Sequence, residues 1–306
     1  MLQFSRKTNT LGTVDFPLRA VELNLPNVLV FGERDTFFVF LQPMNKYALF
    51  FDIDGTLVSF KTHRIPESTV RALEMAKANR SEVYIATGRP PMIITNLTDI
   101  EHLIDGYITI NGAYCYIGHE LVYYQPIAHE DVLTCVADAQ QKGYSLIVVG
   151  RDNVAVLDPT GDVDRIFRQF LGVQEFNEPL PLEDILSQDV LQLTPFFGPG
   201  YEPELLSRMP HCTSGRWHPE FTDITSNQAD KGKGILAIAR HKGFDVSRTI
   251  AFGDGGNDLS MIRQAGIGVA MGNASDELKR NADYITTSVD DDGILNALNF
   301  YIRNRP

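Results

Sequence analysis

The sequence predicts an α/β fold, in which a Rossmann-like, doubly wound parallel sheet carries a smaller α/β module inserted into the chain. Two observations support this prediction. Short apolar runs alternate with amphipathic segments from residue 46 onward, and polar clusters recur where the apolar runs end. Such alternation is typical of parallel sheets covered on both faces. The carboxyl ends of their strands form the edge at which ligands bind.

The core elements follow one another in a regular series. Residues 47–51 form a continuous apolar run, which is typical of a strand that is buried on both faces. Residues 66–79 carry Val70, Leu73 and Ala76 at every third position, which predicts an amphipathic helix. The other expected core elements are strands at 82–86, 107–110, 249–252 and 267–271 and a helix at 235–242.

A middle region differs from the segments around it. Its candidate helices lie at 131–141 and 162–171, its candidate strands lie at 145–149 and 190–195, and it has no polar cluster of catalytic type. We expect residues 44–127 and 211–306 to form one catalytic core. We expect residues 128–210 to form an inserted α/β cap that acts as a lid over the site.

Residues 1–43 stand outside this series as an N-terminal extension of unknown role. Two apolar runs, at 28–31 and 37–40, are separated by charged residues and favour a hairpin. The core strand that begins near residue 46 needs nothing before it, so the extension is assigned no function.

The charge and composition exclude several classes of partner. A formal charge of −12 disfavours nucleic acid and anionic membranes, both of which select basic surfaces. No apolar run approaches the roughly 18–20 residues that a membrane span needs. The three cysteines form no CxxC pair, which favours a reducing cytoplasm. The oligomeric state stays open.

Two aspartates, Asp52 and Asp54, come directly after the first buried strand, and Gly55 permits a sharp turn. A carboxylate can attack phosphorus and form an aspartyl phosphate that water then hydrolyses. We expect Asp52, at the strand end, to be the nucleophile and Asp54 to act first as general acid and then as base. The alternative is a pair of solvated turn aspartates, which the preceding apolar run disfavours.

A second acidic loop occupies residues 253–258. Mg²⁺ prefers carboxylate, carbonyl and phosphate oxygens, and we expect Asp52, Asp254 and the main-chain carbonyl of Asp54 to bind it. Asn257 can donate to a phosphate oxygen. Asp258 is expected to orient either a metal-bound water or the lysine considered below. A plain turn is the alternative for this loop.

Two further segments offer groups for an anionic substrate. Thr87 and Gly88 provide a hydroxyl and an open backbone N–H for phosphate, whereas Arg89 has three alternatives: the substrate, the lid or a surface pair. A lysine at the start of the helix near residue 231 can neutralise phosphate. The residues alone leave Lys231 and Lys233 as rivals.

These segments resemble the motifs of the haloacid dehalogenase superfamily of phosphohydrolases, and more narrowly its Cof-type sugar phosphatases with an α/β lid. The matching stretches are DxDGT at 52–56, Thr-Gly-Arg at 87–89, Lys-Gly-Lys-Gly-Ile at 231–235 and Gly-Asp-Gly-Gly-Asn-Asp at 253–258. The resemblance covers residue 44 to the C-terminus. The one departure, Gly256 where many relatives carry Glu, touches no metal or phosphate group.

The resemblance adds several expectations. It selects Lys231 over Lys233, and it places Asn111, after the third strand, near the substrate. It implies Mg²⁺-dependent hydrolysis of a phosphate monoester, a hexose or pentose phosphate, in the cytoplasm. The partner would be a small phosphorylated metabolite, and the sequence does not indicate which lid residues select it.

Two other functions share these motifs. A phosphomutase would also form an aspartyl phosphate but would return the phosphoryl group to the sugar. A non-catalytic regulator that binds sugar phosphates is disfavoured, because Asp52, Asp54 and Asp254 are all retained. Product analysis separates hydrolase from mutase.

Overall fold

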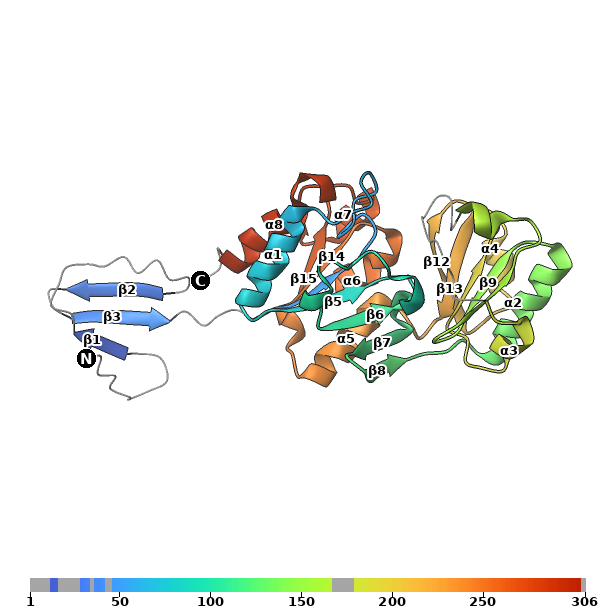
Figure 1. Ribbon diagram of the computed structural model, residues 1–306, viewed down its shortest axis with the longest axis horizontal. Helices are drawn as coiled ribbons and strands as arrows, with labels where there is room; N and C mark the ends of the chain where they lie inside the picture. The colour runs from blue at the N-terminus through green and yellow to red at the C-terminus, as the bar shows by residue number, and fades with distance from the viewer. Residues whose placement is uncertain (1–11, 16–27, 34–35, 42–45, 167–178, 304–306) are drawn as a thin grey trace.

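The structure is a computed structural model that describes residues 12–15, 28–33, 36–41, 46–166 and 179–303. Two units dominate it: an eight-stranded sheet between helices, and a five-stranded sheet with helices packed on it (Figure 1). A small antiparallel sheet of order β1–β3–β2 is formed by Gly12–Asp15, Val28–Glu33 and Thr36–Leu41. The antiparallel pairing of β2 with β3 confirms the expected hairpin partners.

The eight-stranded sheet has the order β16–β15–β14–β4–β5–β6–β7–β8. Its first six strands are parallel and its last two are antiparallel. The strands are β4 (Ala48–Phe51), β5 (Glu82–Ala86), β6 (Gly106–Thr109), β7 (Tyr114–Ile117), β8 (Glu120–Tyr124), β14 (Thr249–Gly253), β15 (Ile267–Ala270) and β16 (Tyr284–Ile285). The predicted doubly wound parallel sheet is therefore confirmed, because every expected core strand belongs to it.

Helices cover both faces of this sheet, and strand β4 shows how (Figure 1). Successive side chains of a strand point to opposite faces. Leu49 and Phe51 therefore share a cluster with α1 (Glu67–Ala78) and α8 (Gly293–Leu298). Phe50 belongs to the cluster of α5, α6 and α7 on the other face. Those three helices are Lys231–Lys242, Leu259–Gln264 and Asp276–Asn281.

The five-stranded sheet is antiparallel throughout, with the order β10–β9–β11–β13–β12. Leu146 and Val148 of β9 pack with α2, α3 and α4, whereas Ile147 and Val149 point to the opposite face, toward Ile93 of the core. The elements are α2 (His129–Lys142), β9 (Leu146–Val149), β10 (Val154–Leu157), α3 (Leu182–Leu186), β11 (Gln192–Pro195), α4 (Glu202–Leu206), β12 (Cys212–His218) and β13 (Phe221–Ser226).

This sheet extends beyond the boundary expected at residue 210. Strands β12 and β13 lie in the segment 211–306 that the sequence assigned to the core, yet β13 pairs with β11. Pairing between strands so far apart in the chain leaves no local signal in the sequence. We propose that the inserted module continues through Ser226. The expected helix at 162–171 is helical over residues 162–166, and its remainder lies outside the described residues.

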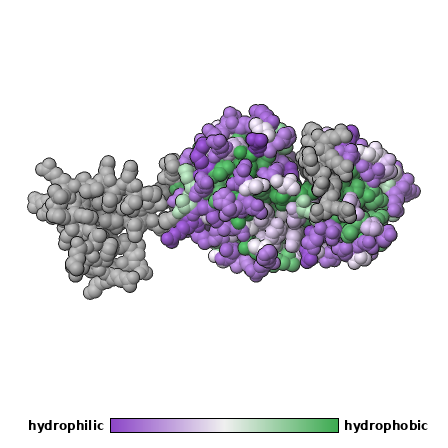
Figure 2. Space-filling view, viewed as in Figure 1, coloured by the Kyte–Doolittle hydropathy of each residue, from purple (hydrophilic) through white to green (hydrophobic). Residues whose placement is uncertain are grey.

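The face seen in Figure 2 is mostly hydrophilic over the eight-stranded unit, whereas the five-stranded unit shows hydrophobic areas among hydrophilic ones. Among the helices that the structure describes, none is long and apolar enough to cross a membrane.

A turn with an uncommon backbone connects β6 to β7. Ile110, Asn111 and Gly112 all have positive φ angles, of 54°, 48° and 92°. A Cβ on Gly112 would lie 2.1 Å from the carbonyl oxygen of Asp230. Asp230 is the N-cap of α5 and accepts a hydrogen bond from the backbone N–H of Lys233. The turn therefore fixes where α5 begins.

We expect Gly112→Ala to destabilise the protein more than Gly118→Ala. Gly118 also has a positive φ, of 57°, but no atom lies within 4 Å of its added Cβ. The conformational cost at either site is about 1–2 kcal/mol. Overpacking against Asp230 should add about 1–3 kcal/mol at Gly112. Urea unfolding followed by circular dichroism measures both, and equal losses would contradict this role of the turn.

Candidate active site

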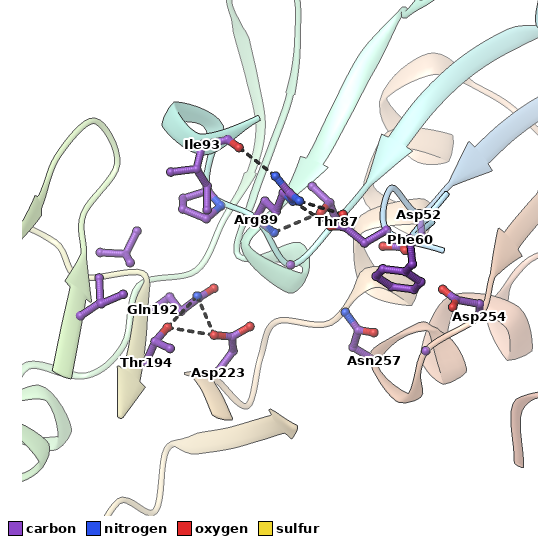
Figure 3. Close-up of a pocket in the computed structure, with 16 residues that line it drawn as sticks. Asp52, Phe60, Thr87, Arg89, Ile93, Gln192, Thr194, Asp223, Asp254 and Asn257 are labelled. Atoms are coloured by element: carbon purple, nitrogen blue, oxygen red, sulfur yellow. Dashed lines mark hydrogen bonds and ion pairs between the residues drawn. The ribbon is translucent and has the colours of Figure 1, made fainter. Parts of the chain in front are cut away.

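The carboxyl ends of the central strands meet beside a pocket of about 260 Å³ (Figure 3). The pocket lies between this edge of the core and the five-stranded sheet, and both contribute lining residues. The core residues that line it include Asp52, Asp54, Thr87, Gly88, Arg89, Asp254 and Asn257. Segments separated by some 200 residues of chain thus contribute to one site, as the polar strand ends predicted.

Lys231 does not line the pocket but contacts the two acidic loops beside it, through Asp52 and Asp258. Its side chain is fully buried, and its Nζ lies 2.7 Å from Asp52 Oδ1 and 2.6 Å from Asp258 Oδ1. Burial alone would lower the pKa of Lys231, but the carboxylates of Asp258 and Asp52 outweigh it and raise that pKa. The rival Lys233 lies elsewhere, with its Nζ on the carbonyl oxygen of Asn227.

Asp258 shapes the second acidic loop. Its Oδ1 accepts from Lys231, and its Oδ2 accepts from the backbone N–H groups of Asp254 and Gly255, both at 2.9 Å. The side chain is fully buried. Of the two alternatives for this residue, the structure therefore shows the contact with Lys231.

Asp254 lies against the first acidic loop. Its Oδ1 is 3.4 Å from Thr56 Oγ1, and its Oδ2 accepts from Asn273 Nδ2 at 3.1 Å. Gly55 has a φ of +84°, and a Cβ at this position would lie 2.2 Å from Asp254 Oδ2. The glycine is required because the two acidic loops approach so closely here.

Asn273 is a site residue that the sequence analysis missed. Its Nδ2 also donates to the carbonyl oxygen of Gly55 at 2.8 Å, and its Oδ1 accepts from the backbone N–H of Val289. It follows β15, at the same edge as the other polar strand ends. The rule that identified those clusters would have found it there.

Arg89 makes a bidentate ion pair with Asp54. Its Nε and Nη2 each lie 2.7 Å from a different oxygen of the Asp54 carboxylate, and its Nη1 donates to the carbonyl oxygen of Ile93 at 3.2 Å. The sequence analysis did not include this contact among its three alternatives. Paired hydrogen bonds of this geometry are among the stronger ones in proteins, so they hold Asp54 in place.

The remaining expected residues divide between the wall of the pocket and its support. Thr87 and Gly88 line the pocket, and Thr87 Oγ1 accepts from the backbone N–H of Arg89. Asn257 also lines it and donates to Asn111 Oδ1 at 3.1 Å. Asn111 is buried behind them and is not a lining residue. Asn111 therefore supports Asn257, and its approach to the substrate stays a prediction.

The charges at this site do not balance. Among the described residues, the carboxylates of Asp52, Asp54, Asp254 and Asp258 face the cations Lys231 and Arg89. Burial and the neighbouring Asp258 raise the pKa of Asp254 to about 7 and also raise the pKa of Asp52. Four carboxylates beside two cationic side chains leave negative charge that these cations do not neutralise.

A hard divalent cation fits this donor set. Carboxylate oxygens of Asp52, Asp254 and Asp258 lie within 4.8 Å of one another, and oxygen ligands are those that Mg²⁺ and Ca²⁺ prefer. Both oxygens of Asp258 are already engaged by Lys231 and the loop N–H groups. Asp52 and Asp254 are therefore the better candidates for ligands.

We expect Lys231→Met to lower the free energy of unfolding by about 3–5 kcal/mol, because it leaves Asp52 and Asp258 buried without their cation. Lys233→Met is the matched control, since that side chain is partly exposed, and it should change stability by about 0.5 kcal/mol or less. Urea unfolding in EDTA compares them. Similar losses in both variants would show that the buried ion pairs do not hold this site together.

Comparison with known proteins places the chain in a family. A sequence model of the haloacid dehalogenase-like hydrolases matches residues 49–298. The putative phosphatase YkrA of Bacillus subtilis (strain 168) is 31% identical over 258 residues, which are 83% of this chain and 97% of that protein.

Solved structures agree with this match. The structure of the subclass IIB sugar phosphatase BT4131 is 47% identical, with a TM-score of 0.79, and the match covers 84% of this chain and 99% of that one. BT1666 from Bacteroides thetaiotaomicron, described among phosphatases of the same superfamily, is 30% identical with a TM-score of 0.75. Its match covers 84% of this chain and 97% of that one. The chain therefore belongs to the haloacid dehalogenase-like hydrolases.

Proposed function

We propose that this protein hydrolyses small phosphate monoesters, hexose or pentose phosphates in particular, with Mg²⁺ and through an aspartyl phosphate on Asp52. That the enzyme is a phosphatase follows from its family; the metal, the intermediate and the substrate are the proposal. The observation that carries it is the meeting of Asp52, Asp54 and Asp254 at one pocket above the buried Lys231. Similarity to the sugar phosphatase BT4131 supports the substrate class.

In the first step, Asp52 attacks the phosphorus atom. Lys231 donates to Oδ1 of Asp52, which leaves the other oxygen to form the new O–P bond. The bond from phosphorus to the ester oxygen breaks, and Asp54 gives that oxygen a proton, so that the alcohol leaves neutral. Thr87, Gly88 and Asn257 supply donors for the phosphate oxygens.

In the second step, water attacks the phosphorus of the aspartyl phosphate. Asp54, now ionised, takes a proton from this water, the Asp52–phosphorus bond breaks, and inorganic phosphate leaves. Arg89 donates to both oxygens of Asp54. A carboxylate has about four lone-pair positions, so Asp54 can exchange a proton while Arg89 holds the Asp54 side chain in place.

The metal would be held by Asp52 and Asp254, with the main-chain carbonyl of Asp54 as a further oxygen. When bound, Mg²⁺ supplies the positive charge that the surplus carboxylates and an incoming phosphate dianion require. Asp258 and Asn273 hold the Asp254 loop for it through the contacts described above.

The setting of the reaction belongs to the same proposal. Cys115, Cys135 and Cys212 are all free thiols, as expected for a chain in a reducing compartment. We therefore propose the cytoplasm as the location and a small phosphorylated metabolite as the partner.

Asp52→Asn should abolish phosphate release. We expect kcat/KM to fall at least on the order of 10⁴-fold, because the nucleophile is lost. The assay measures inorganic phosphate from glucose 6-phosphate, ribose 5-phosphate and p-nitrophenyl phosphate, with Mg²⁺ and with EDTA. Asp152→Asn, an exposed position in the inserted module, is the matched control and should leave the rate unchanged.

The products of the same assay separate the competing functions. ³¹P NMR that shows a new sugar phosphate and no inorganic phosphate would replace the hydrolase with a mutase. Binding of glucose 6-phosphate without any turnover would support a regulator. Release that persists in Asp52→Asn would rule out the proposed nucleophile.

Asp54→Asn should slow turnover by about 10²–10⁴-fold, since it removes the general acid and base. Attack by Asp52 on p-nitrophenyl phosphate needs little acid assistance because nitrophenolate leaves readily. Hydrolysis of the intermediate still needs the base, so phosphorylated enzyme should accumulate. Mass spectrometry after acid quench measures it, with the Asp52→Asn/Asp54→Asn double variant as the blank. Equal phosphorylation of the Asp54→Asn variant and of the double variant would exclude Asp52 as the attachment site.

A further inference from the structure

The wall of the pocket that faces the catalytic edge carries three polar side chains of the five-stranded sheet. They are Gln192 and Thr194 of β11 and Asp223 of β13 (Figure 3). Gln192 and Thr194 are two residues apart and therefore point to the same face. All three are at least 96% buried, which is unusual for polar groups unless they are paired.

Hydrogen bonds fix the orientation of the Gln192 amide. Its Nε2 donates to Asp223 Oδ1 at 3.0 Å and to Thr194 Oγ1 at 3.1 Å, and Thr194 Oγ1 donates to Asp223 Oδ1 at 2.8 Å. An ionised carboxylate only accepts hydrogen bonds. The nitrogen of the amide must therefore face Asp223, and both of its hydrogens are used.

The other end of the amide has no such partner. Gln192 Oε1 is buried, and no donor among the described residues lies within hydrogen-bond distance of it. A buried acceptor without a donor costs free energy. Because Gln192 lines the pocket, a donor on a bound ligand can satisfy this oxygen.

The character of this wall limits what that ligand can be. Arg89 is the only cationic side chain among the described residues that line the pocket, and Asp54 already occupies its Nε and Nη2. Ile147 and Val149 lie beside Thr194 and Gln192 in the register of β9 with β11. Among the described residues, this wall thus presents hydrogen-bond acceptors beside apolar surface, and Asp223 is its only acidic or basic side chain.

We infer that Gln192 is a specificity-determining residue whose Oε1 accepts a hydrogen bond from a hydroxyl of an uncharged, polyhydroxylated leaving group. Thr194 and Asp223 are positioning residues that fix the amide. The pocket lining that the structure describes sets four aspartates, Asp52, Asp54, Asp223 and Asp254, against one cationic side chain, Arg89, so it disfavours leaving groups with a carboxylate or a second phosphate. This inference rests on the proposed function, which it deepens.

Kinetics on matched substrates test the inference in the full-length enzyme. Glucose 6-phosphate or ribose 5-phosphate, whichever is hydrolysed faster, provides hydroxyls. 6-Phosphogluconate adds a carboxylate, and p-nitrophenyl phosphate has no hydroxyl. We expect wild type to prefer the sugar phosphate over 6-phosphogluconate by about 10-fold or more in kcat/KM.

Gln192→Leu should then lower kcat/KM for the sugar phosphate by about 10-fold, as the loss of a hydrogen bond would. The value for p-nitrophenyl phosphate should stay within about 3-fold, since that ester has no hydroxyl for Gln192 to bind. Gln188→Leu, at an exposed glutamine of the same module, should change neither. A parallel fall for both substrates of Gln192→Leu would show a merely structural role and overturn the inference.

Gln192→Lys provides a second test, in which the expected result is a gain in activity toward one substrate. Partial unfolding of the variant could not produce such a gain. The ammonium group would add a cation to this pocket lining, so the ratio of kcat/KM for 6-phosphogluconate over the sugar phosphate should rise by about 10-fold. The ratio is measured within one variant and does not depend on the folded fraction. An unchanged ratio, or a wild type that prefers 6-phosphogluconate, would overturn the inference. Absence of metal-dependent release from every ester, including p-nitrophenyl phosphate, would instead refute the proposed function.

Discussion

The buried ammonium of Lys231 is the interaction on which the rest of the site depends. Burying a charge is costly unless opposite charges neutralise it, so Asp52 and Asp258 both have to lie within ion-pair distance of the ammonium group. This requirement brings together the end of β4, the loop after β14 and the first turn of α5. Asp258 in turn fixes the position of Asp254, because its second oxygen accepts a hydrogen bond from the backbone N–H of Asp254. One lysine thus aligns three segments of the chain.

The same balance of charge explains why the site is suited to a metal and to phosphate. Lys231 compensates part of the acidic cluster, and Arg89 compensates Asp54. Burial and the neighbouring carboxylate of Asp258 raise the pKa of Asp254 to about 7. Another lysine at this site would close the balance of charge and leave less negative charge for a cation to neutralise. Surplus negative charge at a functional site is therefore a property that chemistry requires.

The two sheets contribute different parts of the pocket for a simple geometric reason. Parallel strands in the core gather side chains at their ends, where Asp52 and Asp254 meet, whereas the antiparallel strands of the inserted module offer a whole face. Alternation along β9 and β11 buries Leu146 and Leu193 against the helices and turns Ile147 and Gln192 to the pocket. The alternation of side chains along these strands thus places one set of residues in the core of the module and the other set in the wall opposite the catalytic edge.

The sequence by itself determined the parallel sheet, and it singled out Asp52, Asp54 and Asp254 as polar strand ends that the structure brings to one pocket, because both depend on short-range pattern. It did not indicate that β12 and β13 join the five-stranded sheet, since β13 does so by pairing with β11, from which α4 and β12 separate it in the chain. The role of Arg89, the supporting place of Asn111 and the contribution of Asn273 were likewise decided by the tertiary structure. Hydrogen-bond partners that are far apart in the chain become neighbours only when the loops pack, so no local pattern encodes them.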